Sequence, residues 1–388
     1  MKLTFQQKRR FDEIARDFEQ WGLGPIDQFL PSEVTGEGKK RTEKILKHLE
    51  QVHESFASGK KDYSSFDVGR SFIGGEPCFV PVENEKLGLG LCPVASLKTR
   101  CCNLKTLDVF RNCGFDCSYC SIQSFFDDDR IFVETDLAAK LSRIEIDPAK
   151  TYHIGTGQSS DSLIWGNRFG VLDALLEFAR SHPNVILELK TKSDSVGDLL
   201  ARDVPRNVIC TWSLNTSIII EKEERGTASL ENRLTSMRKI ADKGIMVGAH
   251  FHPMMPYEGW QEDYRVVFNT LLGKFSPAEV AMISFGTLTY PRAVLSKIRQ
   301  RHIKTKVLQM PMVEIAGKYS YPRAVKVDLF SFAYQEFMPW HGKVFFYLCM
   351  EDASLWKEIF GHEYVSNEEF EGAMKSAYLE KIHLHRRT

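Results

Sequence analysis

The chain has 388 residues, of which 43% are hydrophobic and 26% charged, as is typical of a folded globular protein rather than a disordered one. Its 51 lysines and arginines balance 51 aspartates and glutamates, so any contact with nucleic acid requires a local basic patch. The N-terminal sequence is too charged for a secretion signal, and no apolar run approaches the ~18 residues of a membrane span. We therefore expect a cytoplasmic protein with no membrane partner.

The N-terminal region, residues 1–106, is predicted to be a helical extension followed by an irregular segment. Thr4 and Gln7 have capping-box spacing, and the apolar residues that follow recur at the spacing of one helix face. A second amphipathic helix is expected to end near Gly59. Because glycine, proline and cysteine interrupt residues 70–106, no regular element is predicted there.

The central region, residues 107–305, alternates β-rich runs with amphipathic helical segments. Such repeats predict parallel strands joined by right-handed crossovers. Six repeats favour an α/β fold, a partial (β/α)6 barrel of the TIM type. The predicted strands begin at positions 107, 151, 185, 207, 245 and 280, and helices are expected at 169–180, 229–243 and 261–273.

Polar clusters follow five of these strands, which is informative because barrel active sites gather at the carboxyl ends of strands. A cysteine-rich loop follows the first strand, and GTGQSSD, KTKSD, SLNT and HPMMPYEGW follow the next four. The remaining residues, 306–388, mix strand and turn signals before a last helix that begins near Ser366. We expect this C-terminal segment to cap the substrate side of the barrel.

Five of the nine cysteines fall between positions 101 and 120. Cys113, Cys117 and Cys120 have CxxxCxxC spacing in a loop after a strand, so their thiolates can converge on one soft metal centre. Three ligands would leave one iron of a [4Fe-4S] cluster without a protein ligand. The alternative is a zinc site completed by a remote cysteine or histidine, although zinc ligands more often come as two CxxC pairs.

With an aromatic residue before its last cysteine, this motif resembles that of the radical S-adenosylmethionine superfamily. Within that superfamily the chain is similar to spore photoproduct lyase and its relatives, from about residue 107 to 322. Several short motifs occur in the same order, which makes the resemblance specific. They are CGFDCSYCSIQ, SSD at 159–161, TK at 191–192, SLN at 213–215, YEGW at 257–260 and KYSYP at 318–322.

The resemblance implies an enzyme that uses a [4Fe-4S] cluster to cleave S-adenosylmethionine, so that a 5'-deoxyadenosyl radical abstracts hydrogen from a substrate. A reductant such as flavodoxin or ferredoxin would supply the electron. The substrate would be a pyrimidine lesion in DNA, or else a nucleotide, RNA or a small metabolite. A non-catalytic, zinc-bearing nucleic-acid binding module is the alternative from a different class.

The resemblance also implies which residues bind S-adenosylmethionine. The strand pattern supports one of them, because apolar residues alternate with Glu188, Lys190 and Lys192 and so direct these three inward. An inward ammonium suits the carboxylate of the cofactor, whereas a salt bridge within the barrel and structural turn roles are the alternatives. The expected cofactor-binding residues are Ser160, Lys192, Ser213 and Asn215.

Two further motifs supply candidates. His250 and His252 lie on one face of the fifth strand. There they could bind metal, form hydrogen bonds in the active site or form hydrogen bonds only within the protein interior. We place His252 among the cofactor-binding residues. Glu258, in the YEGW motif, is a candidate catalytic carboxylate or a side chain that holds its loop in place.

Two positions depart from the lyase pattern. The family has a cysteine that returns hydrogen to the product radical where this chain has Gln158, and a tyrosine after the last cluster cysteine where this chain has Ser121. Tyr119 is retained, and we predict that Tyr119 and Gln158 lie at the catalytic position. A replacement donor would have to be another thiol, and the candidates are Cys101, Cys102 and Cys349.

Two further features of the sequence have alternative interpretations. A second cluster on Cys78, Cys92, Cys101 and Cys102 is conceivable because four thiolates are the usual requirement, but their irregular spacing favours incidental thiols. The basic stretch 292–306 could contact phosphates or form a solvated helix face.

Overall fold

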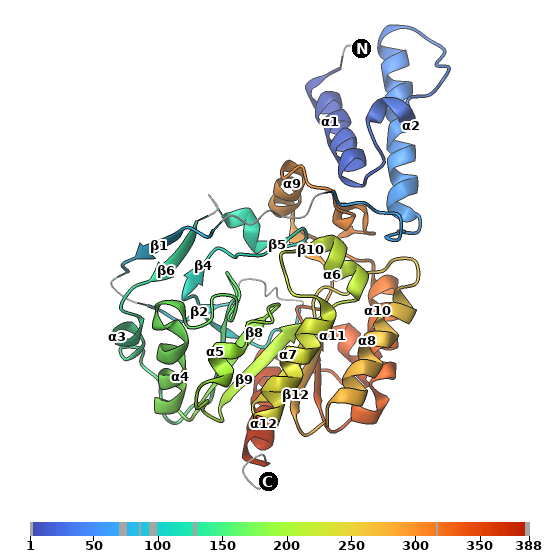
Figure 1. Ribbon diagram of the computed structural model, residues 1–388. Coiled ribbons are helices and arrows are strands. Elements are labelled where there is room, and N and C mark those ends of the chain that lie inside the picture. The colour runs from blue at the N-terminus through green and yellow to red at the C-terminus, as the bar shows by residue number, and fades with distance from the viewer. Residues whose placement is uncertain are drawn as a thin grey trace.

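The computed structural model describes residues 3–69, 76–84, 87–92, 99–126, 130–315 and 317–384, so parts of the irregular segment lie outside the described residues. Figure 1 shows a curved sheet with helices around it and a helical hairpin at the N-terminus that projects away from the sheet. Within the described ranges, no helix combines the length and the apolar character needed to cross a bilayer.

The central sheet is the partial barrel that the strand–helix alternation predicts. Its order is β16-β12-β11-β9-β8-β7-β3-β2, and the strands from β16 to β3 pair in parallel, whereas β2 pairs antiparallel at one edge. The strands are β2 (Gly90–Leu91), β3 (Lys105–Leu107), β7 (Tyr152–Thr156), β8 (Val185–Thr191), β9 (Val208–Ser213), β11 (Met246–Phe251), β12 (Val280–Phe285) and β16 (Phe345–Leu348).

Helices connect these strands and cover the sheet (Figure 1), and the three predicted helices at 169–180, 229–243 and 261–273 correspond to α4, α7 and α8. The helices of the barrel and C-terminal region are α3 (Leu137–Leu141), α4 (Val171–Ser181), α5 (Gly197–Leu200), α6 (Ser217–Glu223), α7 (Leu230–Asp242), α8 (Trp260–Lys274), α9 (Arg292–Gln300), α10 (Arg323–Glu336), α11 (Ala353–Phe360) and α12 (Asn367–Leu384).

The first predicted strand differs from the structure. The barrel strand β3 ends at Leu107, and β4 (Phe110–Arg111) pairs instead with β6 (Ile131–Glu134) in a second small sheet completed by β1 (Phe79–Val82). Between them the Asp108 carboxylate accepts a hydrogen bond from the Ser159 hydroxyl at 2.8 Å. The chain therefore leaves the barrel at Asp108 and runs through this small sheet before the cysteine loop.

The C-terminal segment contributes a strand to the central sheet. Its strand β16 pairs in parallel with β12, with Met282 opposite Phe345 and Phe285 opposite Leu348. A separate hairpin-like sheet beside the barrel mouth has the order β13-β15-β14. Its strands are β13 (Thr289–Pro291), β14 (Val313–Ile315) and β15 (Lys318–Ser320).

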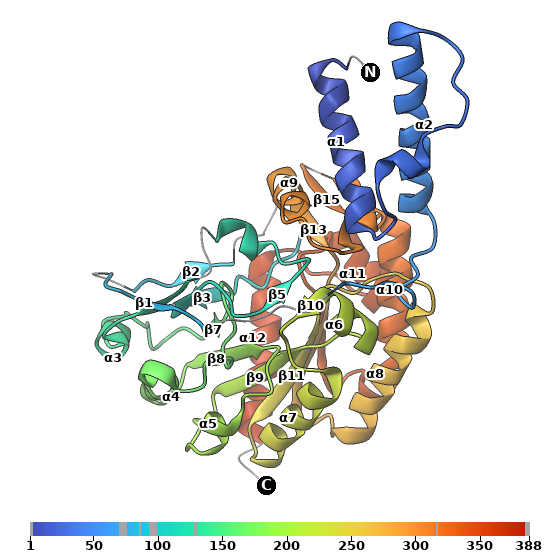
Figure 2. The same ribbon diagram turned by 45° about the horizontal axis from the view of Figure 1, so that its top comes forward.

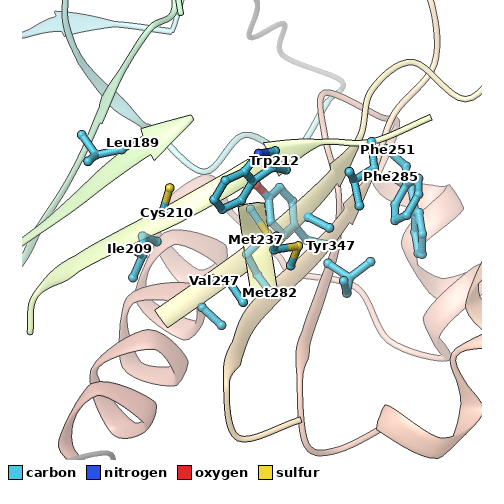
Figure 3. Close-up of a cluster of buried hydrophobic side chains, with 14 of the residues drawn as sticks. Leu189, Ile209, Cys210, Trp212, Met237, Val247, Phe251, Met282, Phe285 and Tyr347 are labelled. Atoms are coloured by element: carbon cyan, nitrogen blue, oxygen red, sulfur yellow. The ribbon is translucent and has the colours of Figure 1, made fainter. Parts of the chain in front are cut away.

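Large, buried apolar side chains pack against the central sheet (Figure 3). Trp212 and Met237 are fully buried, as are Val247 and Met282 on neighbouring strands. Cys210 is also fully buried in β9, which confirms the prediction that it belongs to the core. Burial of each such side chain contributes about 1.5–3 kcal/mol, so the sheet provides a rigid support for the loops at its carboxyl end.

The N-terminal extension folds as the sequence predicts. Helix α1 (Phe5–Gln20) begins with a capping box between Thr4 and Gln7, and α2 (Gly38–Ser58) ends at Gly59. The two helices enclose a small core of their own, separate from that of the barrel. Its buried residues are Ile14, Phe18, Trp21, Ile26 and Leu49.

Candidate active site

A cavity of about 180 Å³ lies among the loops that follow the barrel strands, and the three motif cysteines line it. Loops after β7, β8, β9 and β11 supply other lining residues. Most of the sequence-predicted site residues therefore converge. Those on the cavity are Cys113, Cys117, Cys120, Tyr119, Gln158, Ser160, Lys192, Ser213 and His252.

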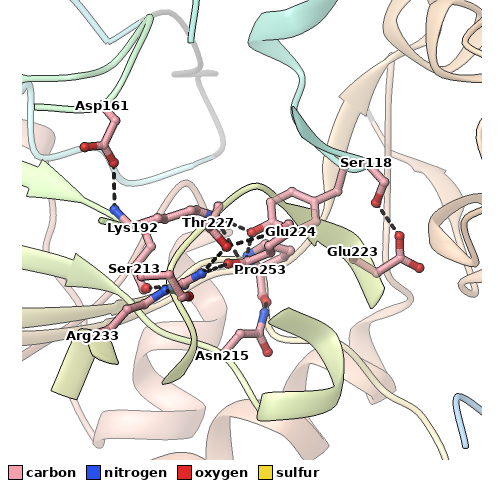
Figure 4. A network of polar contacts seen from close by, with 12 residues as sticks. Ser118, Asp161, Lys192, Ser213, Asn215, Glu223, Glu224, Thr227, Arg233 and Pro253 are labelled. Atoms are coloured by element: carbon pink, nitrogen blue, oxygen red, sulfur yellow. Dashed lines mark hydrogen bonds and ion pairs between the residues drawn. The ribbon is translucent and has the colours of Figure 1, made fainter. Parts of the chain in front are cut away.

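The cysteine loop is held in place by a short strand. Strand β5 (Asp116–Cys117) pairs antiparallel with β10 (Glu224–Arg225), and the Ser118 amide donates to the Glu223 carbonyl at 2.8 Å. The Ser118 hydroxyl also donates to the buried Glu223 carboxylate (Figure 4). Arg301 donates to the Cys117 carbonyl at 3.2 Å. The loop thus has a fixed backbone path before any ligand binds.

Burial controls the protonation of the thiols. It raises the pKa of Cys117 to about 12 and that of Cys113 well above its usual range, so both carry protons when no metal is near. In the described part of the chain, no three His, Cys, Asp or Glu side chains are grouped as the ligands of one metal ion would be. Thiolates form when a bound cation displaces these protons.

A buried carboxylate organises the cavity wall beside the cysteines (Figure 4). Glu224 accepts hydrogen bonds from the Tyr119 hydroxyl at 2.5 Å and Arg233 at 2.6 Å, and the Lys192 ammonium lies 3.4 Å away. Burial alone would raise the pKa of Glu224, but Arg233 and Lys192 lower it to about 2. The site therefore holds Lys192 as a cation whose position is fixed by an ionised partner.

The loop after β7 is fastened to the end of β8 through Asp161. Its carboxylate accepts hydrogen bonds from the Thr191 hydroxyl and the Lys192 amide, both at 2.7 Å. The neighbouring Ser160 hydroxyl is buried in the cavity wall and has no hydrogen-bond partner among the described residues. Because a buried hydroxyl without a partner costs free energy, Ser160 is placed to bond a ligand.

Two predicted site residues lie away from the cavity. The Asn215 side chain donates to the Pro253 carbonyl at 2.9 Å and accepts from the Tyr264 hydroxyl at 2.7 Å, so it fastens the loop after β11 to α8. Glu258 is more than half exposed and lies 3.5 Å from Lys60. Neither side chain lines the cavity, so the cofactor contact of Asn215 and the catalytic role of Glu258 stay predictions.

The sequence reading did not identify Glu224 and Arg233 as site residues. Glu224 lies in the run EKEERG, residues 221–226, whose composition is typical of an exposed segment. Arg233 gives a weak signal, because it occupies the same face of α7 as buried Met237 and Ile240. A charged residue at an apolar position of a helix indicates a buried ion pair or a functional contact.

Other cysteines lie apart from the motif. Cys101 and Cys102 share a hydrogen bond between their side chains, which lowers the pKa of Cys101 to about 6. The same hydrogen bond, together with burial and Cys349, raises the pKa of Cys102. Cys78, by contrast, is exposed. The vicinal pair thus lies near Cys349, and none of these three thiols lines the cavity.

Comparison with known proteins places these features in a family. The family model described as spore photoproduct lyase matches residues 106–330, more than half of the chain. The spore photoproduct lyase of Geobacillus sp. strain Y412MC61 is 27% identical over 154 residues, which are 39% of this chain and 44% of that protein. The Bacillus subtilis strain 168 protein of the same name is 32% identical over 85 residues, 22% of this chain and 25% of that one. The alignments thus span less than half of these curated relatives.

The fold agrees with solved structures of that name. One is a mutant spore photoproduct lyase with bound AdoMet and dinucleoside spore photoproduct, which aligns with a TM-score of 0.59 at 18% identity. The alignment covers 87% of this chain and 94% of that one. A spore photoproduct lyase complexed with dinucleoside spore photoproduct has the same TM-score at 17% identity and the same coverage. This chain, with its cysteine-lined cavity at the mouth of a partial barrel, belongs to the spore photoproduct lyase family.

Proposed function

We propose that this chain is a radical S-adenosylmethionine enzyme that acts on a pyrimidine lesion in DNA. The observation that carries the proposal is the cavity itself, where three motif thiols share the wall with the Ser160 hydroxyl, which is buried and unpaired among the described residues. Thiolate sulfur is the donor that iron–sulfur clusters take, and a polar group without a partner fits a polar ligand. The donor set therefore fits both a [4Fe-4S] cluster and S-adenosylmethionine.

Cys113, Cys117 and Cys120 would hold the cluster in this cavity. The residues that would contact S-adenosylmethionine are Ser160, Lys192, Ser213 and His252. When bound, the cluster supplies one-electron cleavage of the sulfonium bond, and the resulting radical takes a hydrogen atom from the substrate. The electron would come from a reductant of the flavodoxin or ferredoxin class.

The chain's own residues orient the cofactor and exclude water. Lys192, held between Tyr119 and Glu224, presents a fixed positive charge to a carboxylate. Phe115, Ile122 and other apolar residues line the same cavity, and their side chains keep water from a reactive intermediate.

A DNA substrate is supported by the family and by a groove beside the barrel. The similar structures hold a dinucleoside spore photoproduct. In this chain a groove of about 1050 Å³ runs between α1 and α9 and includes Arg16, Arg292 and Tyr319; Figure 2 shows these helices side by side. Among the described residues, neither Arg16 nor Arg292 has a carboxylate partner. Free guanidinium groups beside an aromatic ring suit phosphates and bases.

One residue favours a second candidate substrate. Gln158 lines the cavity where the resemblance leads one to expect a cysteine, and an amide has no weak S–H bond from which to return hydrogen. An enzyme that does not return hydrogen from a thiol at this position fits a substrate whose product radical is quenched by another route. That substrate would be a nucleotide, RNA or a small metabolite.

The test is turnover by the anaerobically reconstituted protein on an oligonucleotide that carries spore photoproduct. The controls are undamaged DNA, RNA and nucleotides, with metal content measured in parallel. We expect iron and sulfide in about the ratio of a [4Fe-4S] cluster and restoration of thymines from the lesion. Cofactor cleavage without lesion repair would reject the DNA lesion and favour the second candidate. Stoichiometric zinc without cleavage would reject the enzyme altogether.

A further inference from the structure

A line of hydrogen-bonded side chains runs through the barrel interior and ends at the cavity. Glu188 on β8 lies 2.7 Å from His250 Nε2 on β11. His250 Nδ1 lies 2.7 Å from the Ser284 hydroxyl on β12, and that hydroxyl lies 3.0 Å from His252 Nε2. His252 lines the cavity, whereas Glu188, His250 and Ser284 are buried behind it. The line therefore links the barrel interior to the proposed cofactor site.

The buried end of this line is a carboxylate. Glu188 also accepts hydrogen bonds from His153 Nε2 and the Thr211 hydroxyl, both at 2.7 Å. Burial alone would raise its pKa, but the hydrogen bonds from His153 and His250 hold the pKa well below the usual range. An ionised carboxylate only accepts hydrogen bonds. Each histidine nitrogen that faces Glu188 must therefore carry a proton.

That requirement fixes the tautomers along the line. Burial and the nearby Lys190 lower the pKa of His250 to about 4, so the ring is neutral at pH 7 and has one N–H group. Because His250 Nε2 carries that proton, Nδ1 accepts the Ser284 hydroxyl proton. The Ser284 oxygen then accepts from His252 Nε2–H. In a neutral His252 ring, Nδ1 is left unprotonated.

The position of His252 is also fixed by packing. A Cβ atom at Gly286 would lie 3.1 Å from the His252 ring, so glycine leaves room for the ring at this point. The His250 and His252 ring centroids are 5.2 Å apart. The charged groups that face His252 are the ammonium groups of Lys190 and Lys192 and the Glu188 carboxylate. The two ammonium groups can only donate hydrogen bonds, whereas an unprotonated His252 Nδ1 can accept one.

We propose that His252 Nδ1 accepts a hydrogen bond from a hydroxyl or amino group of the bound S-adenosylmethionine. Glu188, His250 and Ser284 are positioning residues that impose this tautomer from within the barrel. The inference rests on the proposed function, because it concerns the same cavity. It adds a specific role for the interior polar line, which the cysteine chemistry alone does not explain.

The first test measures the dissociation constant of S-adenosylmethionine by calorimetry on the oxidised, cluster-loaded protein. His252→Leu removes the acceptor and is expected to weaken binding about five- to tenfold, the worth of one hydrogen bond. His252→Asn keeps an oxygen close to the Nδ1 position and should bind within about twofold of the wild type. Equal affinity of His252→Leu and the wild type would overturn the inference.

The second test reads the tautomer without a substitution at His252. Nitrogen-15 spectra of histidine-labelled, cluster-loaded protein should show His252 with protonated Nε2 and unprotonated Nδ1, and Ser284→Ala should leave a mixture of tautomers. A protonated Nδ1 in the wild type would contradict the inference. If the loaded protein does not bind S-adenosylmethionine at all, the proposed function itself fails. The two failures are therefore distinguishable.

Discussion

Glu224 and Arg233 show what a single residue contributes to this site. The two side chains meet at 2.6 Å in the interior, and Arg233 also donates to the Ser213 carbonyl at 2.9 Å. The sequence predicts the cysteines because their spacing is local, whereas this pair joins two segments whose composition resembles that of a surface. Only the fold reveals that β10 carries Glu224 under the cysteine loop.

Glu224→Gln tests this contact. The substitution leaves Arg233 and Lys192 as buried cations without a carboxylate, so we expect the free energy of unfolding in urea to fall by about 3 kcal/mol. The cysteine loop should also retain less iron after reconstitution. Glu221→Gln, at an exposed position of the preceding helix α6, is the matched control and should leave both values unchanged. Equal stability of the two variants would contradict the role assigned to Glu224.

Ser160→Ala separates a ligand contact from a structural one. Because the Ser160 hydroxyl is buried and has no partner in the part of the chain that the structure describes, its removal should leave the melting temperature of the free protein unchanged or slightly raised. The affinity for S-adenosylmethionine should fall about five- to tenfold. Thermal denaturation with and without the cofactor measures both effects. Loss of stability in the free variant, with affinity intact, would show that the hydroxyl has a structural partner instead.

At the scale of elements, motif order predicted which loops meet but not where each side chain points. The loops after β7, β8, β9 and β11 do surround one cavity, as the barrel pattern predicts. Asn215 lies in one of them, yet its side-chain amide forms hydrogen bonds with Pro253 and Tyr264. Glu258 lies beyond another and faces Lys60 of the N-terminal region. Side-chain direction depends on tertiary contacts that spacing does not encode.

The N-terminal hairpin is attached to α9 through a buried carboxylate. Asp17 lies 2.7 Å from both His53 of α2 and Arg299 of α9, and Gln20 donates to the carbonyls of Ile298 and Arg299. The hairpin and α9 also form the two sides of the arginine-containing groove. The sequence predicts both helices, but it gives no sign that they pack on α9.

Asp17→Asn should loosen this attachment without unfolding the barrel. Hydrogen exchange is expected to accelerate in α1 and α2, since the charged contact to Arg299 is lost, while β8 and β9 keep their protection. Asp12→Asn, on the groove side of α1, serves as the control. Uniform acceleration across the whole chain would show that the hairpin and barrel unfold as one unit.

At the scale of the whole molecule, the barrel was predictable because six β-rich runs alternate with amphipathic helices. The additional strand β16 was not, since the chain passes through β14, β15 and α10 before it returns to the sheet and pairs with β12. Buried polar groups inside the barrel were only partly predictable. The inward direction of Glu188 follows from strand alternation, whereas its two histidine partners depend on the curvature of the sheet.

These buried histidines make the stability of the molecule depend on pH. The pKa of His250 is about 4 in the folded protein and ordinarily about 6.5. Between these values the unfolded chain binds more protons, so stability is lost as the pH falls from 7 to 4, by about 3 kcal/mol for this one group. Urea unfolding across this range should show a shallower loss for His250→Gln than for the wild type. His302→Gln, an exposed control, should follow the wild type.

The central claim is that Cys113, Cys117 and Cys120 carry a cluster that cleaves S-adenosylmethionine. Its most direct test is formation of 5'-deoxyadenosine by the anaerobically reconstituted protein with dithionite as electron donor. The wild type and Cys78→Ala, which changes an exposed thiol away from the cavity, should both form it, whereas Cys117→Ala should form essentially none. Equal product from Cys117→Ala and the wild type, or none from the wild type, would contradict the account.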